Sequence, residues 1–178
     1  MQHHRRSIRL RGHDYSQSGF YFITVCTAQR ECLFGNIVDG EMVLNEYGQM
    51  VRDEWAKTAS IRREITLDEY VIMPNHFHGI LVIADGRGDR PVARTKTNSV
   101  AGTKPQSGPM PRSIGAFVAG FKSAVTQRIN TKRQTPRQPV WQRNYYEHII
   151  RNDAELNNIR EYIRNNPAQW ELDDLYRS

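Results

Sequence analysis

Residues 65–83 read ITLDEYVIMPNHFHGILVI, and this stretch decides the fold. Two runs rich in β-branched and aromatic residues flank the dipeptide Pro74-Asn75, which is typical of a turn. The pattern therefore predicts two adjacent antiparallel strands, Ile65 to Met73 and His76 to Ile83.

The second predicted strand begins with a pair of histidines. Side chains two residues apart on a strand project from the same face, so His76 and His78 can offer two imidazoles to one ion while Phe77 points into the core. A divalent metal ion needs further ligands from elsewhere in the chain and an open position for substrate. Because a His-x-His pair also occurs in ordinary strands, the pair alone leaves both a metal site and a purely structural role open.

The rest of the chain predicts further strands and helices around this pair. An aromatic, β-branched run predicts a first strand, and later segments show apolar residues at helical spacing. The expected elements are a strand over Gly19 to Thr27, a helix capped by Asn45 and running to about Ser60, an amphipathic helix from Arg112 to Arg133, and a last helix from near Asp153 that Pro167 stops.

Length and composition bound the class of protein. The 178 residues, 38% of them hydrophobic and 25% charged, suit one soluble domain. No apolar run approaches the roughly 20 residues of a membrane span, and no secretory signal is readable, so a cytoplasmic location is expected. Two cysteines, Cys26 and Cys32, are too few for a disulfide scaffold or a four-cysteine zinc site.

Positive charge is concentrated in three segments. Residues 1–13 and 85–112 each carry a net charge of +4, and residues 113–151 carry +6. The segment 85–112 lacks periodic apolar positions and is predicted to be a flexible basic loop. Clustered Lys and Arg suit a phosphate-binding surface, whereas a solvated basic face is the plain alternative.

The last predicted helix carries a second candidate group. Tyr162 and Asn166 are four residues apart and lie on one helical face, where a phenol can act as nucleophile and an amide oxygen as a neutral metal ligand. The alternative is a core tyrosine and an asparagine that only caps the helix.

A third candidate is the stretch from Trp141 to His148, in which aromatic and basic residues alternate and can stack bases and clamp phosphates. Burial of Trp141 and Tyr145 in the core explains the same pattern equally well.

Four motifs, taken together, strongly resemble those of the single-tyrosine HUH transposases, and more narrowly the REP-associated tyrosine transposases. They are FYFITV at 20–25, YVIMPNHFH at 70–78, VWQRNYYEHIIR at 140–151 and YIRNNP at 162–167. The resemblance covers residues 19–84 and 113–171, in order and at suitable spacing.

This resemblance implies an α+β fold in one domain over residues 1–178, with a ferredoxin-like antiparallel sheet. His76 and His78 then match the paired histidine ligands, Asn166 the polar third ligand and Tyr162 the nucleophile, with Tyr145 or Tyr146 as the fallback. It also implies a Mg²⁺ or Mn²⁺ ion, no nucleotide cofactor, and a 5′-phosphotyrosine intermediate in single-stranded DNA cleaved and rejoined near REP-like hairpins.

The basic segments are then expected to grip the hairpin and its flanking strand, with the protein acting as a monomer or a homodimer. The best candidates for phosphate contacts are Lys122, Arg128, Lys132, Arg133, Arg137 and Arg143. Two other functions fit the same residues. One is a DNA-binding relative without activity, and the other is a metal-dependent nuclease that uses an activated water.

Overall fold

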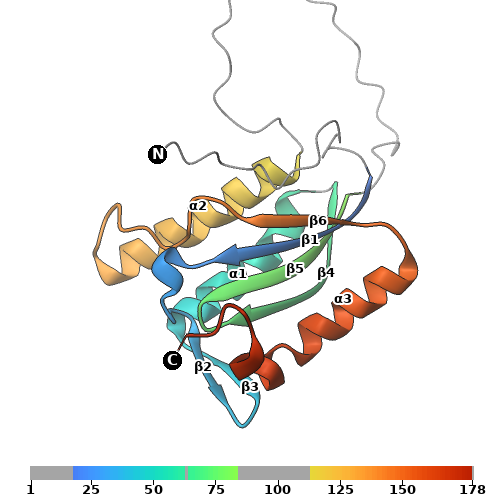
Figure 1. Cartoon of the computed structure of the whole chain (residues 1–178). Coiled ribbons are helices and arrows are strands. Elements are labelled where there is room, and N and C mark those ends of the chain that lie inside the picture. The colour runs from blue at the N-terminus through green and yellow to red at the C-terminus, as the bar shows by residue number, and fades with distance from the viewer. Residues whose placement is uncertain (1–17, 63, 84–112, 178) are drawn as a thin grey trace, which may run out of the picture.

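The computed structural model describes residues 18–62, 64–83 and 113–177, so the basic N-terminal arm and the predicted loop at 85–112 lie outside the described residues. A four-stranded antiparallel sheet has the strand order β4-β5-β1-β6 (Figure 1). Its strands are β1 (Gly19–Cys26), β4 (Ile65–Met73), β5 (His76–Ile83) and β6 (Tyr146–Ile150), and a separate hairpin pairs β2 (Gly35–Val38) with β3 (Glu41–Leu44).

The helices are α1 (Glu46–Ile61), α2 (Ile114–Arg133) and α3 (Asp153–Asn165), and two short 3-10 helices are η1 (Ala28–Arg30) and η2 (Pro167–Leu172). Without the β2–β3 hairpin, the order β1-α1-β4-β5-α2-β6 and the all-antiparallel sheet are those of a ferredoxin-like fold. The predicted α+β class is therefore confirmed.

Strand β5 is buried on both faces, because helices cover the sheet from two sides (Figure 1). On one face, Phe77 and Leu81 pack with α1 and α2 in the larger core cluster. On the other face, Ile80 packs with Leu156 and Ile163 of α3 in a smaller cluster. The alternation of a strand places Phe77 in the main core, as predicted, and turns His76 and His78 toward α3.

A glycine allows the main core to approach β5 closely. A Cβ atom on Gly79 would lie 2.8 Å from both the Phe77 ring and the Trp55 indole. The missing side chain lets the indole of Trp55 on α1 pack at a tilt against the Phe77 ring, with 4.6 Å between the ring centroids, on the face of β5 opposite the two histidines. The strand that carries the histidines is thus fixed from the rear by close aromatic packing.

The helix boundaries follow local capping chemistry. The side chain of Asn45 accepts hydrogen bonds from the backbone N–H groups of Tyr47 and Gly48, which confirms the predicted cap of α1. Asn152 caps the start of α3 through its side chain. The helix ends at Asn165, and η2 begins two residues later at Pro167. The cap and the proline together fix the length of the helix that carries Tyr162.

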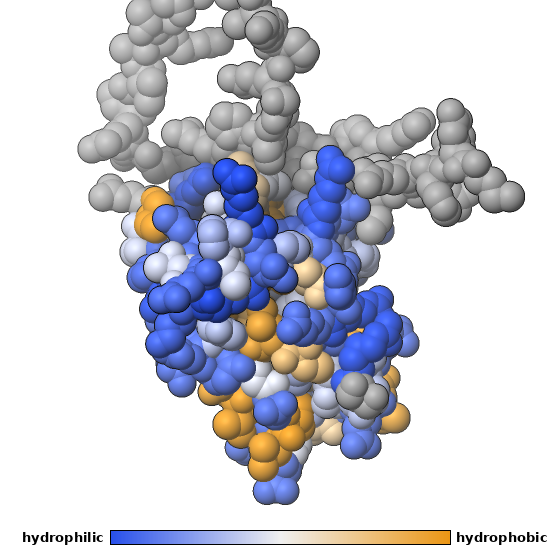
Figure 2. Space-filling view, turned by 90° about the vertical axis from the view of Figure 1, so that its left-hand side faces the viewer, coloured by the Kyte–Doolittle hydropathy of each residue, from blue (hydrophilic) through white to orange (hydrophobic). Residues whose placement is uncertain are grey.

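The β2–β3 hairpin forms the lower end of the molecule, where hydrophobic residues gather on the surface (Figure 2). Val38 and Val43 on this hairpin are half exposed.

In the described part of the chain, no helix has both the length and the apolar composition that a bilayer crossing requires.

Two arginines of α3 grip a bulge in the edge strand β4. Arg160 donates from Nε and Nη2 to the carboxylate of Asp68 at 3.1 and 2.5 Å, and Arg164 donates twice to Glu69 at 3.0 and 2.6 Å. Both carboxylates lie where the β4–β5 register shifts, between Leu67 and Tyr70. The small cluster under α3 is therefore supplemented by two forked ion pairs.

We expect Asp68→Asn to lower the free energy of unfolding by about 1 kcal/mol at neutral pH, because a partly buried forked pair contributes about that much. The hydrogen bonds from Arg160 lower the pKa of Asp68. A lowered folded-state pKa stabilises the protein above the unfolded value of about 3.9, and this contribution disappears as the pH falls through the folded pKa. Thermal unfolding of the variant and the wild type should therefore converge in acid. An equal gap at all pH values, or the same gap for Glu161→Gln on the exposed side of α3, would contradict this assignment.

Candidate active site

The rings of His76 and His78 lie side by side on one face of β5, and the Nδ1 atom of each ring contacts a neighbouring polar side chain. The ring centroids of His76 and His78 are 4.5 Å apart, and both side chains are buried. Nδ1 of His76 lies 2.8 Å from Oδ1 of Asn75, and Nδ1 of His78 lies 2.8 Å from the hydroxyl of Thr24. Because an amide oxygen only accepts, His76 carries its proton on Nδ1 and keeps the lone pair on Nε2.

Two buried polar atoms in this region have no hydrogen-bond partner among the described residues. They are Nε2 of His76 and Oδ1 of Asn166. A buried acceptor without a partner costs free energy, so such atoms require an explanation. Both are metal-ligating types, an imidazole nitrogen and an amide oxygen, and an ion bound between them would satisfy both.

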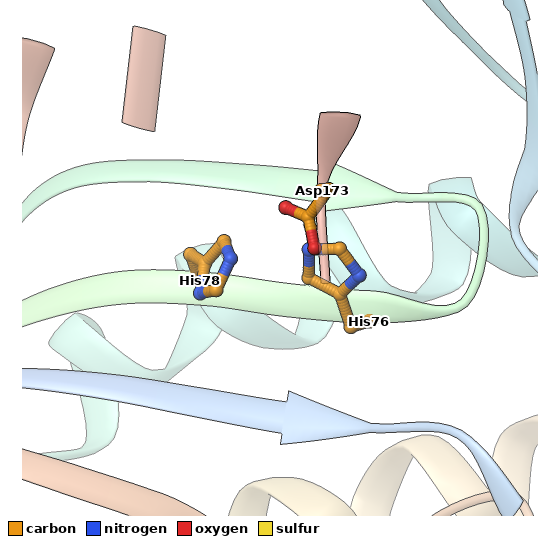
Figure 3. A group of neighbouring side chains, drawn as sticks. All are labelled: His76, His78 and Asp173. Carbon is orange, nitrogen blue, oxygen red and sulfur yellow. The ribbon is translucent and has the colours of Figure 1, made fainter. Parts of the chain in front are cut away.

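A carboxylate completes the group. Asp173 approaches the histidines from the segment after η2, as Figure 3 shows, and one ligand atom from each of the three residues lies within 4.8 Å of the others. Two nitrogens and a carboxylate oxygen can hold a divalent metal ion. Oδ2 of Asp173 also accepts a hydrogen bond from Nδ2 of Asn166 at 2.8 Å, which turns the Oδ1 atom of Asn166 away from Asp173.

Burial keeps both imidazoles neutral. Desolvation lowers the pKa of His76 to about 4, partly offset by the Asp173 carboxylate. Desolvation and the neighbouring His76 hold the pKa of His78 well below its usual value. A neutral imidazole is the ligating form, so at pH 7 no proton has to be displaced before an ion binds.

Tyr162 of α3 reaches the same site. Its Oη atom lies 3.2 Å from Nε2 of His78 and 3.5 Å from Oδ2 of Asp173. The ring packs edge-on against Phe22 and His78, while 44% of the residue stays exposed. Burial and the Asp173 carboxylate raise the pKa of Tyr162 to about 12, so without a nearby cation the phenol keeps its proton at neutral pH.

The structure thus brings together four of the residues singled out in the sequence, namely His76, His78, Tyr162 and Asn166. No pattern in the sequence gives a role to Asp173, Thr24 or Asn75. Asp173 lies beyond the helix that Pro167 ends. The sequence signal in this segment is Trp170 of η2, a large aromatic residue that the structure shows to be buried against the domain.

Backbone contacts hold the C-terminal segment over the site. Nδ2 of Asn75 donates to the carbonyl of Leu175 at 2.8 Å, and Arg30 donates to the carbonyl of Asp174 at 3.3 Å. The indole of Trp170 lies 5.9 Å from the His76 ring. These contacts determine where Asp173 lies.

An open cleft of about 680 Å³ is lined by His78, Tyr162, Asn166 and Asp173. Aromatic and polar side chains surround the mouth, and among them are Phe22, Arg30, Gln142, Asn144 and Tyr146. The cleft therefore offers ring faces, amides and a cation next to the histidines, which suits a ligand that carries both bases and phosphates.

We expect Asn75→Ala to weaken metal binding by about 10- to 100-fold, as is typical when the partner of a ligating histidine is lost. Asn75→Asp keeps the acceptor for Nδ1 of His76 and should recover most of that affinity, while losing the donor to Leu175. Calorimetric titration with Mn²⁺ measures both variants. Equal losses in the two would show that Asn75 acts only by holding the C-terminal segment.

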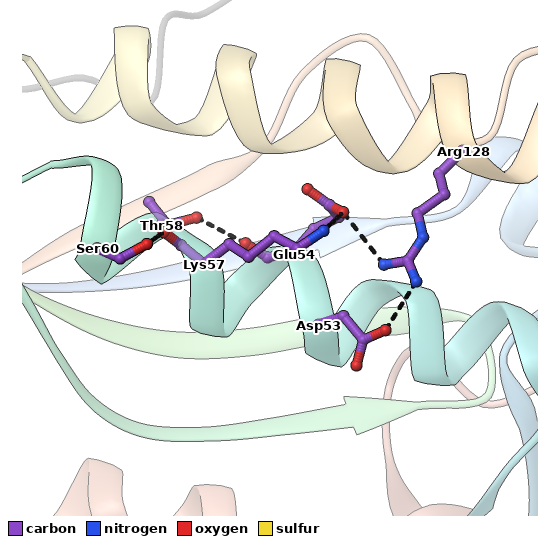
Figure 4. A network of polar contacts seen from close by, with 6 residues as sticks. All are labelled: Asp53, Glu54, Lys57, Thr58, Ser60 and Arg128. Carbon is purple, nitrogen blue, oxygen red and sulfur yellow. Dashed lines mark hydrogen bonds and ion pairs between the residues drawn. The ribbon is translucent and has the colours of Figure 1, made fainter.

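The predicted DNA-contacting cations fall into two groups. Ion pairs or backbone carbonyls engage the first group, and Figure 4 shows Arg128 of α2 bound to Asp53 at 2.8 Å and Glu54 at 3.1 Å on α1. Lys132 pairs with Glu46 in the same interface. Lys122 donates to the carbonyls of Gln142 and Arg143, and Arg133 donates to Asn130 and the carbonyl of Gln138.

The second group is Arg137 and Arg143, whose side chains make no hydrogen bond or ion pair within the described ranges. They lie on the segment between α2 and β6. Contact with phosphate stays a prediction for all six cations, and these two have the guanidinium groups that are free for it.

The aromatic stretch before β6 also divides. Trp141 is 7% exposed and packs against Phe34 and Phe121, so its burial matches the core alternative. Tyr145 is partly buried, and its hydroxyl donates to Glu147 at 2.5 Å. Tyr146 remains exposed at the cleft and meets Phe22 edge-on at 6.4 Å.

Two proteins of Haemophilus influenzae are similar to this chain in sequence. An uncharacterized protein of Haemophilus influenzae is 44% identical over 177 residues, which is 98% of this chain and 94% of the relative. A second H. influenzae protein, provisionally described as a REP-associated tyrosine transposase, is 24% identical over 88% of this chain and 74% of its own length. No family model matches the chain.

Among solved structures, a REP-associated tyrosine transposase bound to a REP hairpin has the same fold. The TM-score is 0.57 with 20% identity, over 95% of this chain and 74% of that one. Sequence and fold comparisons thus confirm the resemblance that the four motifs indicate.

Proposed function

We propose that this chain, which belongs to one family with the 44% identical H. influenzae protein and is related in sequence and fold to REP-associated tyrosine transposases, is a metal-dependent single-stranded DNA endonuclease and strand transferase. The observation that carries the proposal is the meeting of Tyr162 with His78 and Asp173 in one open cleft. A nucleophile beside a set of metal-ligating atoms is the minimum that phosphodiester transfer to a side chain requires.

The donor set fits a divalent cation. His76 and His78 would supply two nitrogens, and Asn166 and Asp173 would supply oxygens, which would leave room for phosphate and water on the ion. Mg²⁺ or Mn²⁺ suits this mixed set, and Mn²⁺ tolerates imidazole better. When bound, the ion would polarise the scissile phosphate and offset the negative charge that Asp173 places beside the phenol.

The chain's own groups would then carry the transfer. Oη of Tyr162 attacks the phosphorus, the bond from phosphorus to the 3′ oxygen breaks, and the 3′ oxygen takes up a proton as a free hydroxyl. The phenol proton passes to water, to which the half-exposed Tyr162 has access. The product is a 5′-phosphotyrosine, and attack by another 3′-hydroxyl reverses the step and rejoins DNA, so no nucleotide cofactor is consumed.

The partner in this proposal is single-stranded DNA that carries a hairpin. The solved relative is bound to a REP hairpin, and the cleft of this chain offers exposed Tyr146, Arg30 and several amide side chains beside the nucleophile. These groups suit base stacking and phosphate contact.

The direct test incubates the full chain with a library of labelled single-stranded hairpins and Mn²⁺, followed by denaturing electrophoresis. A covalent protein–DNA adduct that a chelator prevents is the expected result. Cleavage without an adduct would identify a nuclease that uses water, and binding without cleavage of any library member would identify a DNA-binding relative.

A further inference from the structure

A second cavity lies beside the catalytic cleft, between α2 and the segment 134–143 that follows it. It is open to solvent, and its volume of about 910 Å³ is within the usual range of ligand-binding clefts. Gln142 lines both this cavity and the catalytic cleft, so the two hollows adjoin across one short stretch of chain.

The charge of the cavity is one-sided. Lys122, Arg137 and Arg143 line it, and none of the described lining residues is acidic. On the other side of α2, in contrast, Arg128 and Lys132 are neutralised by carboxylates of α1. The two unpaired guanidinium groups therefore face a hollow that attracts an anion.

The uncharged lining suits a base. Gln127 and Gln134 present amides that can donate and accept hydrogen bonds, and Pro136 and Pro139 supply apolar surface. Trp141 also lines the cavity, and its buried Nε1 donor has no partner among the described residues. Cations, amides and apolar surface in one hollow are what a base with its attached phosphate requires.

Hydrogen bonds on both sides fix the segment 141–143, which separates the cavity from the cleft. Nζ of Lys122 donates to the carbonyls of Gln142 and Arg143 at 2.6 and 3.1 Å. On the other side, the N–H group of Gln142 donates to the carbonyl of Cys26 at 2.9 Å, and Thr27 forms a β-bridge with Trp141. A fixed wall keeps the cavity at a constant separation from the nucleophile.

We infer that this cavity binds one nucleotide of the single strand that flanks the cleavage site, with the base inside and its phosphates on Arg137 and Arg143. The inference rests on the proposed function for the identity of the strand. The strand passes over Gln142 from the cavity into the cleft, and so one anchored nucleotide sets the phosphate that Tyr162 meets. Figure 2 views the molecule from the side on which the turn after α2 lies in Figure 1, and hydrophilic residues cover most of the upper part of this face.

The test measures fluorescence anisotropy of a labelled, unstructured single-stranded 20-mer with the full chain in the absence of metal. Arg137→Glu places a carboxylate at the cavity, and Thr126→Trp fills it without changing charge. Each is expected to weaken binding by about tenfold, the size of one lost stacking or phosphate contact. Arg52→Glu, on exposed α1, reverses the same charge away from the cavity and should change affinity less than about threefold.

Two results would overturn the inference. One is wild-type affinity in both cavity variants, and the other is a loss no greater than that of Arg52→Glu. Should Thr126→Trp fail to fold, Arg137→Glu against Arg52→Glu decides alone. Formation of the covalent adduct by the wild type is measured separately. If the wild type forms the adduct but the cavity variants bind the 20-mer normally, the cavity inference is refuted. If the cavity variants lose binding but the wild type forms no adduct, only the catalytic proposal is refuted.

Discussion

Replacement of Tyr162 by phenylalanine is expected to abolish the covalent DNA adduct. Removal of a covalent nucleophile typically costs on the order of 10⁴-fold or more in rate, so the adduct should fall below detection. The ring contacts with Phe22 and His78 are kept, and only the hydroxyl contacts to His78 and Asp173 are lost. We therefore expect unchanged thermal unfolding to within about 1 kcal/mol. Denaturing electrophoresis with Mn²⁺ measures the adduct.

Tyr146→Phe is the matched control. Tyr146 is similarly exposed at the same cleft, and its ring also meets Phe22. This variant should form the adduct normally, because its hydroxyl makes no described contact with the histidines. An adduct that survives in Tyr162→Phe and disappears in Tyr146→Phe would identify Tyr146 of β6 as the nucleophile instead. Cleavage that survives in both would leave water as the nucleophile.

Replacement of His78 by alanine is expected to remove both metal binding and strand cleavage. In the proposed metal site His78 would supply one of the two nitrogens, and its ligand atom lies within 4.8 Å of those of His76 and Asp173. Loss of an essential ligand should lower cleavage by about a thousandfold or more, as the loss of a main electrostatic element does in other enzymes. In the wild type, Mn²⁺ at 100 times its dissociation constant should add about 2.7 kcal/mol of stability, and the variant should gain none.

Thermal unfolding with and without Mn²⁺ measures this effect independently of any DNA. Thr24→Val is the matched control, because it removes the hydroxyl on Nδ1 of His78 and leaves the imidazole in place. It should retain a weakened response to the ion, about 10- to 100-fold lower in affinity. An undiminished Mn²⁺ response in His78→Ala would refute the metal site, whatever the effect on cleavage.

The secondary structure could be predicted because its signals are local. The run on either side of Pro74-Asn75 specifies β4 and β5, Asn45 specifies the start of α1, and Pro167 specifies where the last helix stops. Each depends on backbone geometry or on residues a few positions apart. The predicted first strand, Gly19 to Thr27, is one residue longer than β1, because Thr27 leaves the sheet to bridge Trp141.

The basic face of α2 shows where local patterns stop. Helical spacing places Arg128 and Lys132 away from the apolar stripe, and the sequence predicts phosphate contacts for them. The structure pairs both with carboxylates of α1, which the intervening strands bring alongside. Spacing along one helix gives the direction of a side chain, but the charge that meets it belongs to another element.

Backbone periodicity is enough to place His76 and His78 on one face of a strand and Tyr162 and Asn166 on one face of a helix. Packing of the sheet against α3 brings these two faces together, brings Asp173 to the histidines, and sets the contacts of Asn75 and Thr24 with the imidazoles. Apart from the contact between the sequence neighbours Asn75 and His76, these contacts join residues tens of positions apart. They form when the sheet and α3 bury their apolar faces together, a process that no short-range pattern encodes.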